Sequence, residues 1–233
     1  MGNFRQFNRI SIGVVESIII VNVIFFIPSL LFMFTKSTGN AVSGPMIIFN
    51  LLFNLNVNKP DPFLNFNNGA YWQVVTAMFM HGDFFHLFFN MYGLYIFGKP
   101  MENLWGKGKF ILFYFVTGIL TNLLSAIIFI LSGNPLSLIG ASGAVYAVLL
   151  AFAAYYPETR LLLFFIIPLK VKWAILLFTG IELFSQLSNF KDGIAHFAHL
   201  FGFLFAFLYL LIFFRINAIQ KLFFPKKDDY IIY

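Results

Sequence analysis

The sequence contains no cysteine, which excludes disulfide bonds, thiolate metal sites and a cysteine nucleophile. Charge is scarce too, because Asp, Glu, Lys and Arg together make up only 10% of the 233 residues, against roughly 25% in soluble domains. Hydrophobic residues account for 60% of the chain, and the mean hydropathy is +0.85. This composition excludes an ordinary soluble domain. The distribution of the net charge of +6 is therefore taken to indicate the orientation of the chain in the membrane, and not binding to nucleic acid.

Apolar runs long enough to cross a bilayer, roughly 17–25 residues each, recur along the chain. They predict an all-α polytopic membrane protein in which residues 1–233 form one domain with six transmembrane helices. The predicted spans cover approximately residues 18–34, 84–105, 110–131, 139–156, 171–187 and 194–214.

The segments between the spans differ in character. Residues 35–83 mix Gly, Asn and Pro with two short apolar patches, and they predict a long interfacial loop with surface helices, anchored by Tyr71 and Trp72. The stretch "RLLLFFIIPLKVKW" is interrupted by Pro168, Lys170 and Lys172, so we expect it to dip into the interface without spanning it.

Basic residues predict the orientation of the chain. Six spans place both termini on one side, and the side richer in Lys and Arg faces the cytoplasm. Three basic residues fall on the other side: Lys36, Lys59 and Lys191. The remaining twelve fall on the terminal side: Arg5, Arg9, Lys99, Lys107, Lys109, Arg160, Lys170, Lys172, Arg215, Lys221, Lys226 and Lys227. Residues 1–17 and 215–233 are therefore expected to be cytoplasmic, and the loop 35–83 extracytoplasmic.

Polar side chains within the hydrocarbon are costly, so their positions are informative. The four histidines, His81, His86, His196 and His199, all lie at or just inside the outer ends of predicted spans. His86 and Asn90 are four residues apart and share one helix face, as do Ser142 and Tyr146 in the fourth span. This clustering of the histidines is the first indication of a functional site.

Small residues predict which spans meet. Gly143, Ala147 and Ala151 form a stripe on the fourth span, and Gly202 and Ala206 form a shorter one on the sixth. Such stripes allow helix backbones to approach closely. If they face each other, Ser142 and His199 come together, each about one turn from the outer end of its span.

Each polar residue also has a structural interpretation. A serine in an apolar helix commonly bonds to a carbonyl one turn back, and an intramembrane His or Asn can join two helices. For His81 and His196, at the water boundary, we favour the structural role. A transporter is a rival class, but its polar path should cross the membrane, whereas these groups stop about a third of the way in.

Three motifs resemble those of the rhomboid family of intramembrane serine proteases. They are "HGDFFHLFFNMYGLYIFGKPMENLWGKGKF" with Glu102, "GASGAVYA" around Ser142, and "AHLFGFLFA" around His199. The resemblance covers about residues 71–214. Two positions depart from the family pattern: the Trp-Arg pair of the first loop is Trp72-Gln73, which puts loop anchoring in doubt, and the final Gly of the last motif is Ala206.

The resemblance implies a serine endopeptidase that cuts transmembrane segments near their outer ends. Ser142 would be the nucleophile and His199 the base, and we expect a dyad with no carboxylate oriented on the base. The backbone N–H of Ser142 and the side chains of His86 and Asn90 would stabilise the oxyanion. The resemblance gives Tyr146 a stacking role beneath His199, and it makes the fifth span and the loop after it the gate and lid. Gly140, Gly143 and Gly202 would support the site.

No metal or cofactor is expected, nor any nucleic-acid partner. The expected partners are transmembrane protein substrates and the lipid bilayer; the sequence specifies no oligomeric state. The family pattern fits bacterial members, so a bacterial inner membrane is expected. The alternative is a catalytically inactive relative that binds membrane clients without cutting them.

Overall fold

The computed structural model describes residues 12–37, 43–59, 64–163, 166–187 and 196–224, and 75% of it is helical. The helices are α1 (Val14–Ser37), α2 (Ser43–Phe53), α3 (Gln73–Thr76), α4 (Phe84–Gly93), α5 (Lys99–Trp105), α6 (Lys107–Ser132), α7 (Ser142–Tyr155), α8 (Val171–Leu187), α9 (His196–Phe213) and α10 (Ala218–Phe223). The expected all-α membrane fold is confirmed.

Helices α1, α6 and α9 are each long and apolar enough to cross a membrane. The other three predicted spans correspond to the shorter helix α7, the 17-residue helix α8, and a continuous helical run from Phe84 to Trp105. That run contains a π-helical segment, η3 (Leu94–Gly98), between α4 and α5. Asp83 caps its start by accepting a hydrogen bond from the backbone N–H of His86, at 2.9 Å.

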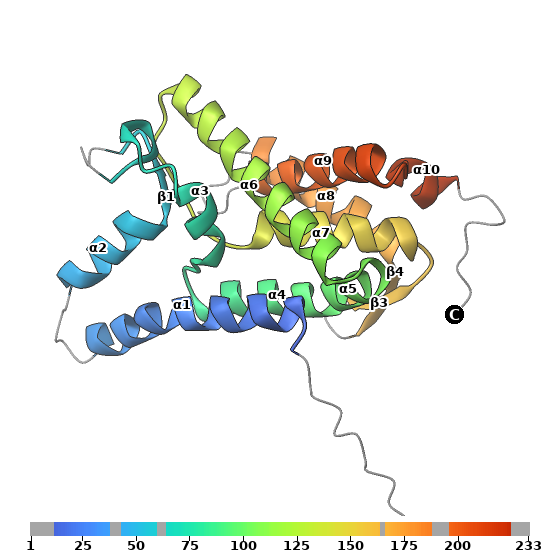
Figure 1. The fold of residues 1–233 in the computed structure, drawn as a ribbon, viewed down its shortest axis with the longest axis horizontal. Coiled ribbons are helices and arrows are strands. Elements are labelled where there is room, and N and C mark those ends of the chain that lie inside the picture. Colours follow the sequence, from blue (N-terminus) through green and yellow to red (C-terminus); the bar gives the residue numbers. More distant parts are fainter. Residues whose placement is uncertain (1–11, 38–42, 60–63, 164–165, 188–195, 225–233) are drawn as a thin grey trace, which may run out of the picture.

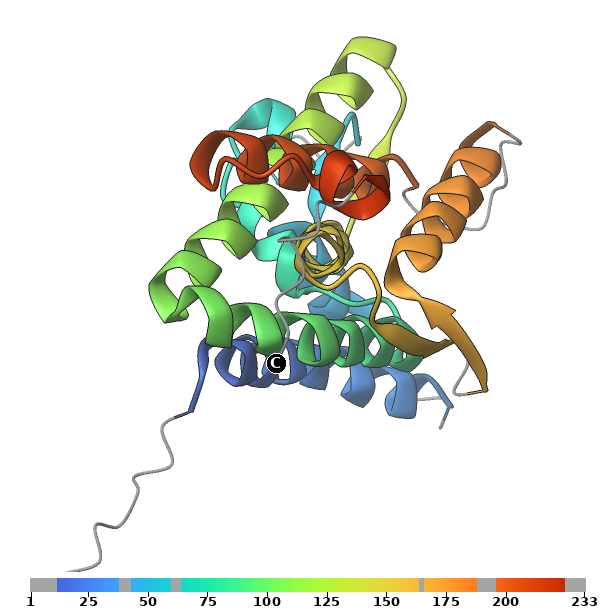
Figure 2. The ribbon, with the colours of Figure 1, turned by 90° about the vertical axis from the view of Figure 1, so that its right-hand side faces the viewer.

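Helix α7 lies at the centre of the bundle, and Figure 2 shows it end-on with the other helices around it. Most of its side chains are buried, and they are Gly, Ala, Val, Leu and Phe. A helix that is apolar on all sides is stable only when it is covered on all sides. The element that bears Ser142 is therefore held rigidly by its neighbours.

The start of α7 differs from the prediction. The fourth span was expected to begin near residue 139, with Ser142 about one turn inside it, but Ser142 is the first residue of the helix. Residues Leu136–Leu138 form a strand, β2, and Gly140 has a φ of +113°, a conformation that glycine adopts without strain. The nucleophile candidate thus sits at the turn where the chain enters the bundle.

Segments of the first loop, within residues 35–83, hold the turn at Gly140 in place through backbone hydrogen bonds. Strand β1 (Leu55–Val57) pairs antiparallel with β2, and the backbone N–H of Gly140 donates to the carbonyl of Ala77 at 2.8 Å. Two 3₁₀ segments, η1 (Phe66–Asn68) and η2 (Ala77–Phe79), complete this loop. The approach to Ser142 is therefore hydrogen-bonded to a segment more than 60 residues away in sequence.

Gln73 does anchor this loop, although its identity put that anchoring in doubt. Its side-chain amide donates to the carbonyls of Leu51 at 2.7 Å and Leu64 at 3.0 Å, and its oxygen accepts from the backbone N–H of Asn56 at 3.0 Å. Trp72 adds a bond to the carbonyl of Leu52 at 2.8 Å. Both amide N–H donors and the oxygen of the buried Gln73 thus have partners, as burial requires.

The stretch expected to dip into the interface is a β-hairpin of β3 (Arg160–Leu163) and β4 (Ile167–Lys170). Glu158 pairs with Lys170 at 2.6 Å and with Lys172, and these two ammonium groups lower the pKa of its carboxyl group. Two positive charges in contact with a carboxylate favour its ionised form, so the base of the hairpin is held by ion pairs.

Figure 1 shows α10 at one end of the bundle and α2 and β1 at the other. Near the start of α1, the carboxylate of Glu102 accepts bonds from the backbone N–H groups of Val14 and Val15, at 2.8 and 3.1 Å. Glu102 therefore satisfies two of the four unpaired donors that a helix N-terminus leaves.

Candidate active site

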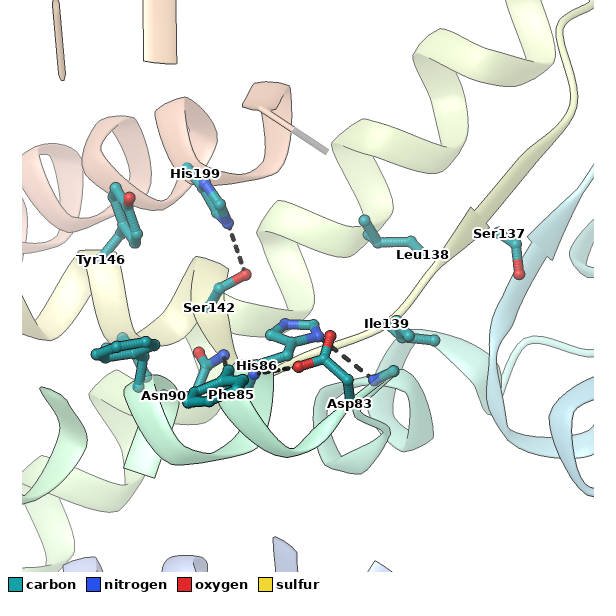
Figure 3. A pocket seen from close by; sticks show the side chains of 13 residues that line it. Asp83, Phe85, His86, Asn90, Ser137, Leu138, Ile139, Ser142, Tyr146 and His199 are labelled. Atoms are coloured by element: carbon teal, nitrogen blue, oxygen red, sulfur yellow. Dashed lines mark hydrogen bonds between the residues drawn. The ribbon is translucent and has the colours of Figure 1, made fainter. Parts of the chain in front are cut away.

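Ser142 and His199 come together as predicted. The Nε2 atom of His199 lies 2.8 Å from the Oγ atom of Ser142, a hydrogen-bond distance, although the residues are 57 positions apart (Figure 3). The helices can approach because glycine faces glycine: a Cβ atom added to Gly202 would lie 2.2 Å from the carbonyl oxygen of Gly143. The small-residue stripes therefore position this pair.

Tyr146 packs flat against the ring of His199. The two ring centroids are 4.3 Å apart and the planes differ by 9°. Tyr146 is one turn below Ser142 on the same helix, so the helix that carries the hydroxyl also carries the group that fixes the tilt of the imidazole.

A pocket of about 580 Å³ opens beside this pair. His86 and Asn90 from α4 line one side of it, Ser142 and Tyr146 from α7 another, and His199 completes it. The structure thus gathers every predicted site side chain around one cavity. Aromatic side chains Phe85 and Phe89 also line it.

His86 is oriented by its neighbours. Its Nδ1 atom accepts from the backbone N–H of Gly82 at 3.4 Å, so in the neutral ring the proton belongs on Nε2. A Cβ atom added to Gly140 would lie 2.7 Å from that Nε2 atom and 3.7 Å from Ser142 Oγ. Glycine at position 140 therefore leaves room for an N–H donor beside the hydroxyl.

Asn90 is buried one turn further along α4, and its side-chain nitrogen donates to the carbonyl of His86 at 2.8 Å. A primary amide carries two N–H donors, so this bond fixes the side chain and leaves a second donor for a group in the pocket. His86 and Asn90 can therefore offer two donors to one anion.

The expectation that no carboxylate contacts the base is wrong. Glu182 on α8 places its Oε1 atom 2.8 Å from Nδ1 of His199 and 2.7 Å from the hydroxyl of Tyr146, while its Oε2 atom lies 2.6 Å from Nδ1 of His196. Glu182 lies on neither of the helices that bear Ser142 and His199, so the dyad expected from the sequence did not include it. An acidic residue within the apolar run "TGIELF" was itself a signal, because such groups are rare in spans.

Glu182, His196 and His199 also have the side chains of a metal site, with ligand atoms within 4.8 Å of one another. Two donors on one tetrahedral zinc ion are roughly 3.3 Å apart. The observed separations of 2.6 and 2.8 Å are those of direct hydrogen bonds, so the three side chains bind one another. An ion could enter only if they moved apart.

His81 is buried beside the site, with its ring edge-on to His86 at a centroid distance of 5.0 Å. Burial lowers the pKa of His81 to about 3, so its ring is neutral at physiological pH. A neutral ring places no positive charge against His86, which fits the packing role expected from the sequence.

The arrangement suits acyl transfer. A serine hydroxyl meets the nitrogen of a neutral imidazole, and N–H donors face the same cavity, which is what nucleophilic attack on a carbonyl requires. Apolar side chains line much of the rest of the pocket: Phe85, Phe89, Leu138, Ile139 and Val145.

Comparison with known proteins extends this picture. Residues 68–216 match the family described as Rhomboid domain. The chain is 38% identical over 110 residues to rhomboid-like protein 11, chloroplastic, of Arabidopsis thaliana; the match covers 43% of this chain and 38% of that protein. It is 33% identical over 81 residues to a Bacillus subtilis (strain 168) protein provisionally named rhomboid protease YdcA. That match covers 34% of this chain and 38% of the Bacillus protein.

A third relative is the presenilin-associated rhomboid-like protein, mitochondrial, of Mus musculus, 32% identical over 93 residues. That match covers 40% of this chain and 25% of the mouse protein. The chain thus aligns with no more than 38% of the length of these three relatives.

Proposed function

The chain belongs to the rhomboid family, and from that premise we propose that it is an intramembrane serine endopeptidase. The observation that carries the proposal is the contact of 2.8 Å between Nε2 of His199 and Oγ of Ser142 beside a cavity with oriented donors. Family membership alone does not separate an enzyme from a relative that only binds clients. The paired hydroxyl and imidazole favour the enzyme.

The reaction begins when His199 accepts the hydroxyl proton of Ser142 on Nε2 and Oγ attacks the carbonyl carbon of the scissile bond. The carbonyl π electrons move onto its oxygen, and a tetrahedral intermediate forms. The C–N bond then breaks, and the imidazolium returns its proton to the leaving nitrogen. Water hydrolyses the remaining acyl-enzyme by the same steps, with His199 as the base.

Three donors are proposed to stabilise the oxyanion: the backbone N–H of Ser142, the Nε2–H of His86 and the free N–H of Asn90. Ser142 begins α7, so its N–H belongs to the set of helix N-terminal donors that have no intrahelical partner. Donors fixed before the reaction stabilise developing charge without reorganisation.

The proposed substrate is a transmembrane segment of another membrane protein, cut near its outer end. A stable helix hides its carbonyls in intrahelical hydrogen bonds, so the cut segment must be locally extended at the site. The predicted gate includes α8; the predicted lid, the loop that follows it, falls within residues 188–195, which lie outside the described residues. Lipid covers the exposed apolar side chains of the bundle in this proposal.

We also propose that both termini are cytoplasmic and that the protein resides in a bacterial inner membrane. Support for the orientation comes from the twelve basic residues that fall on the terminal side. Because the chain has no cysteine, single cysteines report topology directly. In intact cells, Asn134→Cys should react with a membrane-impermeant maleimide and Asn217→Cys should not; the reverse pattern would contradict the orientation.

One experiment separates the enzyme from its rivals. Purified protein in lipid vesicles should convert a single-span substrate into two fragments, with the cut near the outer end of its span. Ion and solute flux through the same vesicles should equal that of protein-free vesicles. Substrate binding without fragments would support the inactive client-binding relative, and flux without fragments would support a transporter.

Asn90→Ala should reduce kcat by roughly 10²–10³, the effect of removing one oxyanion donor in a soluble serine protease. The melting temperature should fall only slightly, because the bond that Asn90 makes is to a carbonyl of its own helix. Kinetics and thermal melting of the same preparation test this. A large fall in melting temperature with kcat preserved would show that Asn90 is purely structural.

A further inference from the structure

We propose that Glu182 on α8 is the positioning residue that holds His199 in its basic form, so that the site operates as a serine–histidine–glutamate triad. This inference rests on the proposed peptidase function and deepens it by naming the group that orients the base. It replaces the dyad expected from the sequence.

The hydrogen bonds of His199 define its tautomer. An ionised carboxylate only accepts hydrogen bonds, so the contact of 2.8 Å with Glu182 places a proton on Nδ1 of His199. The lone pair of a neutral imidazole is then on Nε2, which faces Ser142 Oγ at 2.8 Å. The carboxylate therefore selects the one tautomer that can take the serine proton.

The carboxylate is itself held in place. Glu182 is 5% exposed on an apolar helix, where a charge is costly unless donors surround it. Three donors do so: the Tyr146 hydroxyl at 2.7 Å, and the Nδ1 atoms of His199 and His196 at 2.8 and 2.6 Å. A group bonded on both oxygens has little freedom to turn away from the base.

The same contact serves the charged stage of the reaction. When Nε2 of His199 takes the serine proton, both ring nitrogens carry protons and the ring becomes positive. Glu182 then pairs with the imidazolium through Nδ1–H and keeps its own negative charge, and the Nε2 proton goes on to the leaving nitrogen. Glu182 is not one of the residues that line the pocket, and its hydrogen bonds go to Tyr146, His196 and His199, so it acts on Ser142 through His199.

Glu182 comes from a different helix from either member of the pair. Figure 2 shows α8 at the edge of the bundle, and its side chains Leu177, Ile181 and Phe184 are exposed. The network around Glu182 joins α8 to α7 through Tyr146 and to α9 through the two histidines. The base is therefore correctly oriented only while α8 remains packed against α7 and α9.

Glu182→Gln tests the proposal. A glutamine can donate to Nδ1 of His199 and so place the ring proton on Nε2, the tautomer that cannot accept a proton from serine. In a soluble serine protease the equivalent amide substitution reduces kcat by about 10⁴. We expect kcat for a transmembrane substrate in vesicles to fall by roughly 10²–10⁴, with KM changed by less than about three-fold.

The matched control is Glu102→Gln, since Glu102 is also a buried glutamate, 4% exposed, that accepts bonds near the start of α1. It should lower the melting temperature at least as much as Glu182→Gln does and leave kcat within about three-fold. Glu182→Asp keeps the charge and should restore part of kcat. Equal losses of kcat in Glu102→Gln and Glu182→Gln would overturn the proposal, as would wild-type kcat in Glu182→Gln.

A measurement on the unmodified protein keeps the proposal testable if Glu182→Gln does not fold. In histidine-¹⁵N-labelled protein in micelles, His199 should show the Nδ1-protonated tautomer with a strongly deshielded proton, assigned by its loss in His199→Asn. The Nε2-protonated tautomer would overturn the proposal. Ser142→Ala, assayed alongside, distinguishes failure of the peptidase proposal from failure of the positioning proposal. Cleavage by Ser142→Ala would show that the proposed serine peptidase function is wrong. Wild-type kcat in Glu182→Gln together with an inactive Ser142→Ala would contradict only the positioning role of Glu182.

Discussion

Ser142→Ala and His199→Ala should each abolish cleavage of a transmembrane substrate, with kcat reduced by roughly 10⁶, the loss seen when either member of the pair is removed from a soluble serine protease. The losses should not add in the double variant, because hydroxyl and imidazole act as one unit. The measurement is steady-state cleavage in vesicles, with a detection limit for the cleaved product low enough to reveal this loss.

Both variants should remain folded. Ser142→Ala removes one hydroxyl at the pocket surface, and His199→Ala removes a partly buried ring whose neighbours Tyr146 and Glu182 retain other contacts. Gel filtration and thermal melting provide the control. Substantial cleavage by either variant would contradict the assignment of nucleophile and base, whatever the stability of the protein.

Gly202→Ala should lower both stability and kcat, through packing. The added Cβ atom would lie 2.2 Å from the carbonyl oxygen of Gly143, so α7 and α9 must separate to admit it. Overpacking of this kind costs about 1–3 kcal/mol of stability. Because Ser142 and His199 lie on these two helices, a shift near 1 Å lengthens their hydrogen bond, and kcat should fall about 10²-fold.

Gly180→Ala is the matched control for Gly202→Ala. Gly180 also lies within a helix, α8, but a Cβ atom there would meet nothing within 4 Å. Its replacement should leave kcat and melting temperature close to the wild-type values. Wild-type activity in Gly202→Ala, or equal losses in both variants, would show that close packing of α7 on α9 is not what positions the pair.

The pairing of Ser142 with His199 could be predicted because it follows from local rules. Small residues at i and i+4 identify the faces on which helices meet. Polar groups at the same depth on these two faces then become neighbours. The spacing of His86 and Asn90 likewise follows from helix periodicity. These relations need only the sequence within single spans.

The start of α7 and the role of Glu182 needed three-dimensional information. The apolar run from Leu138 to Tyr156 is continuous in composition, but pairing of β2 with the first loop and the turn at Gly140 delay the helix to Ser142. The depth and rotation of α8, which decide whether Glu182 meets His199 or lipid, depend on packing against α7 and α9. The anchoring role of Gln73 also needed three-dimensional information, because its three hydrogen bonds join backbone groups that are distant in sequence.

The central claim is that His199 activates Ser142, and labelling with a fluorophosphonate probe tests it most directly. Mass spectrometry of the labelled protein should place the covalent phosphonate on Ser142 in the wild type, and labelling should disappear in both Ser142→Ala and His199→Ala. Failure of the folded wild type to react, a phosphonate on another residue, or labelling of His199→Ala at the wild-type rate would each contradict the account.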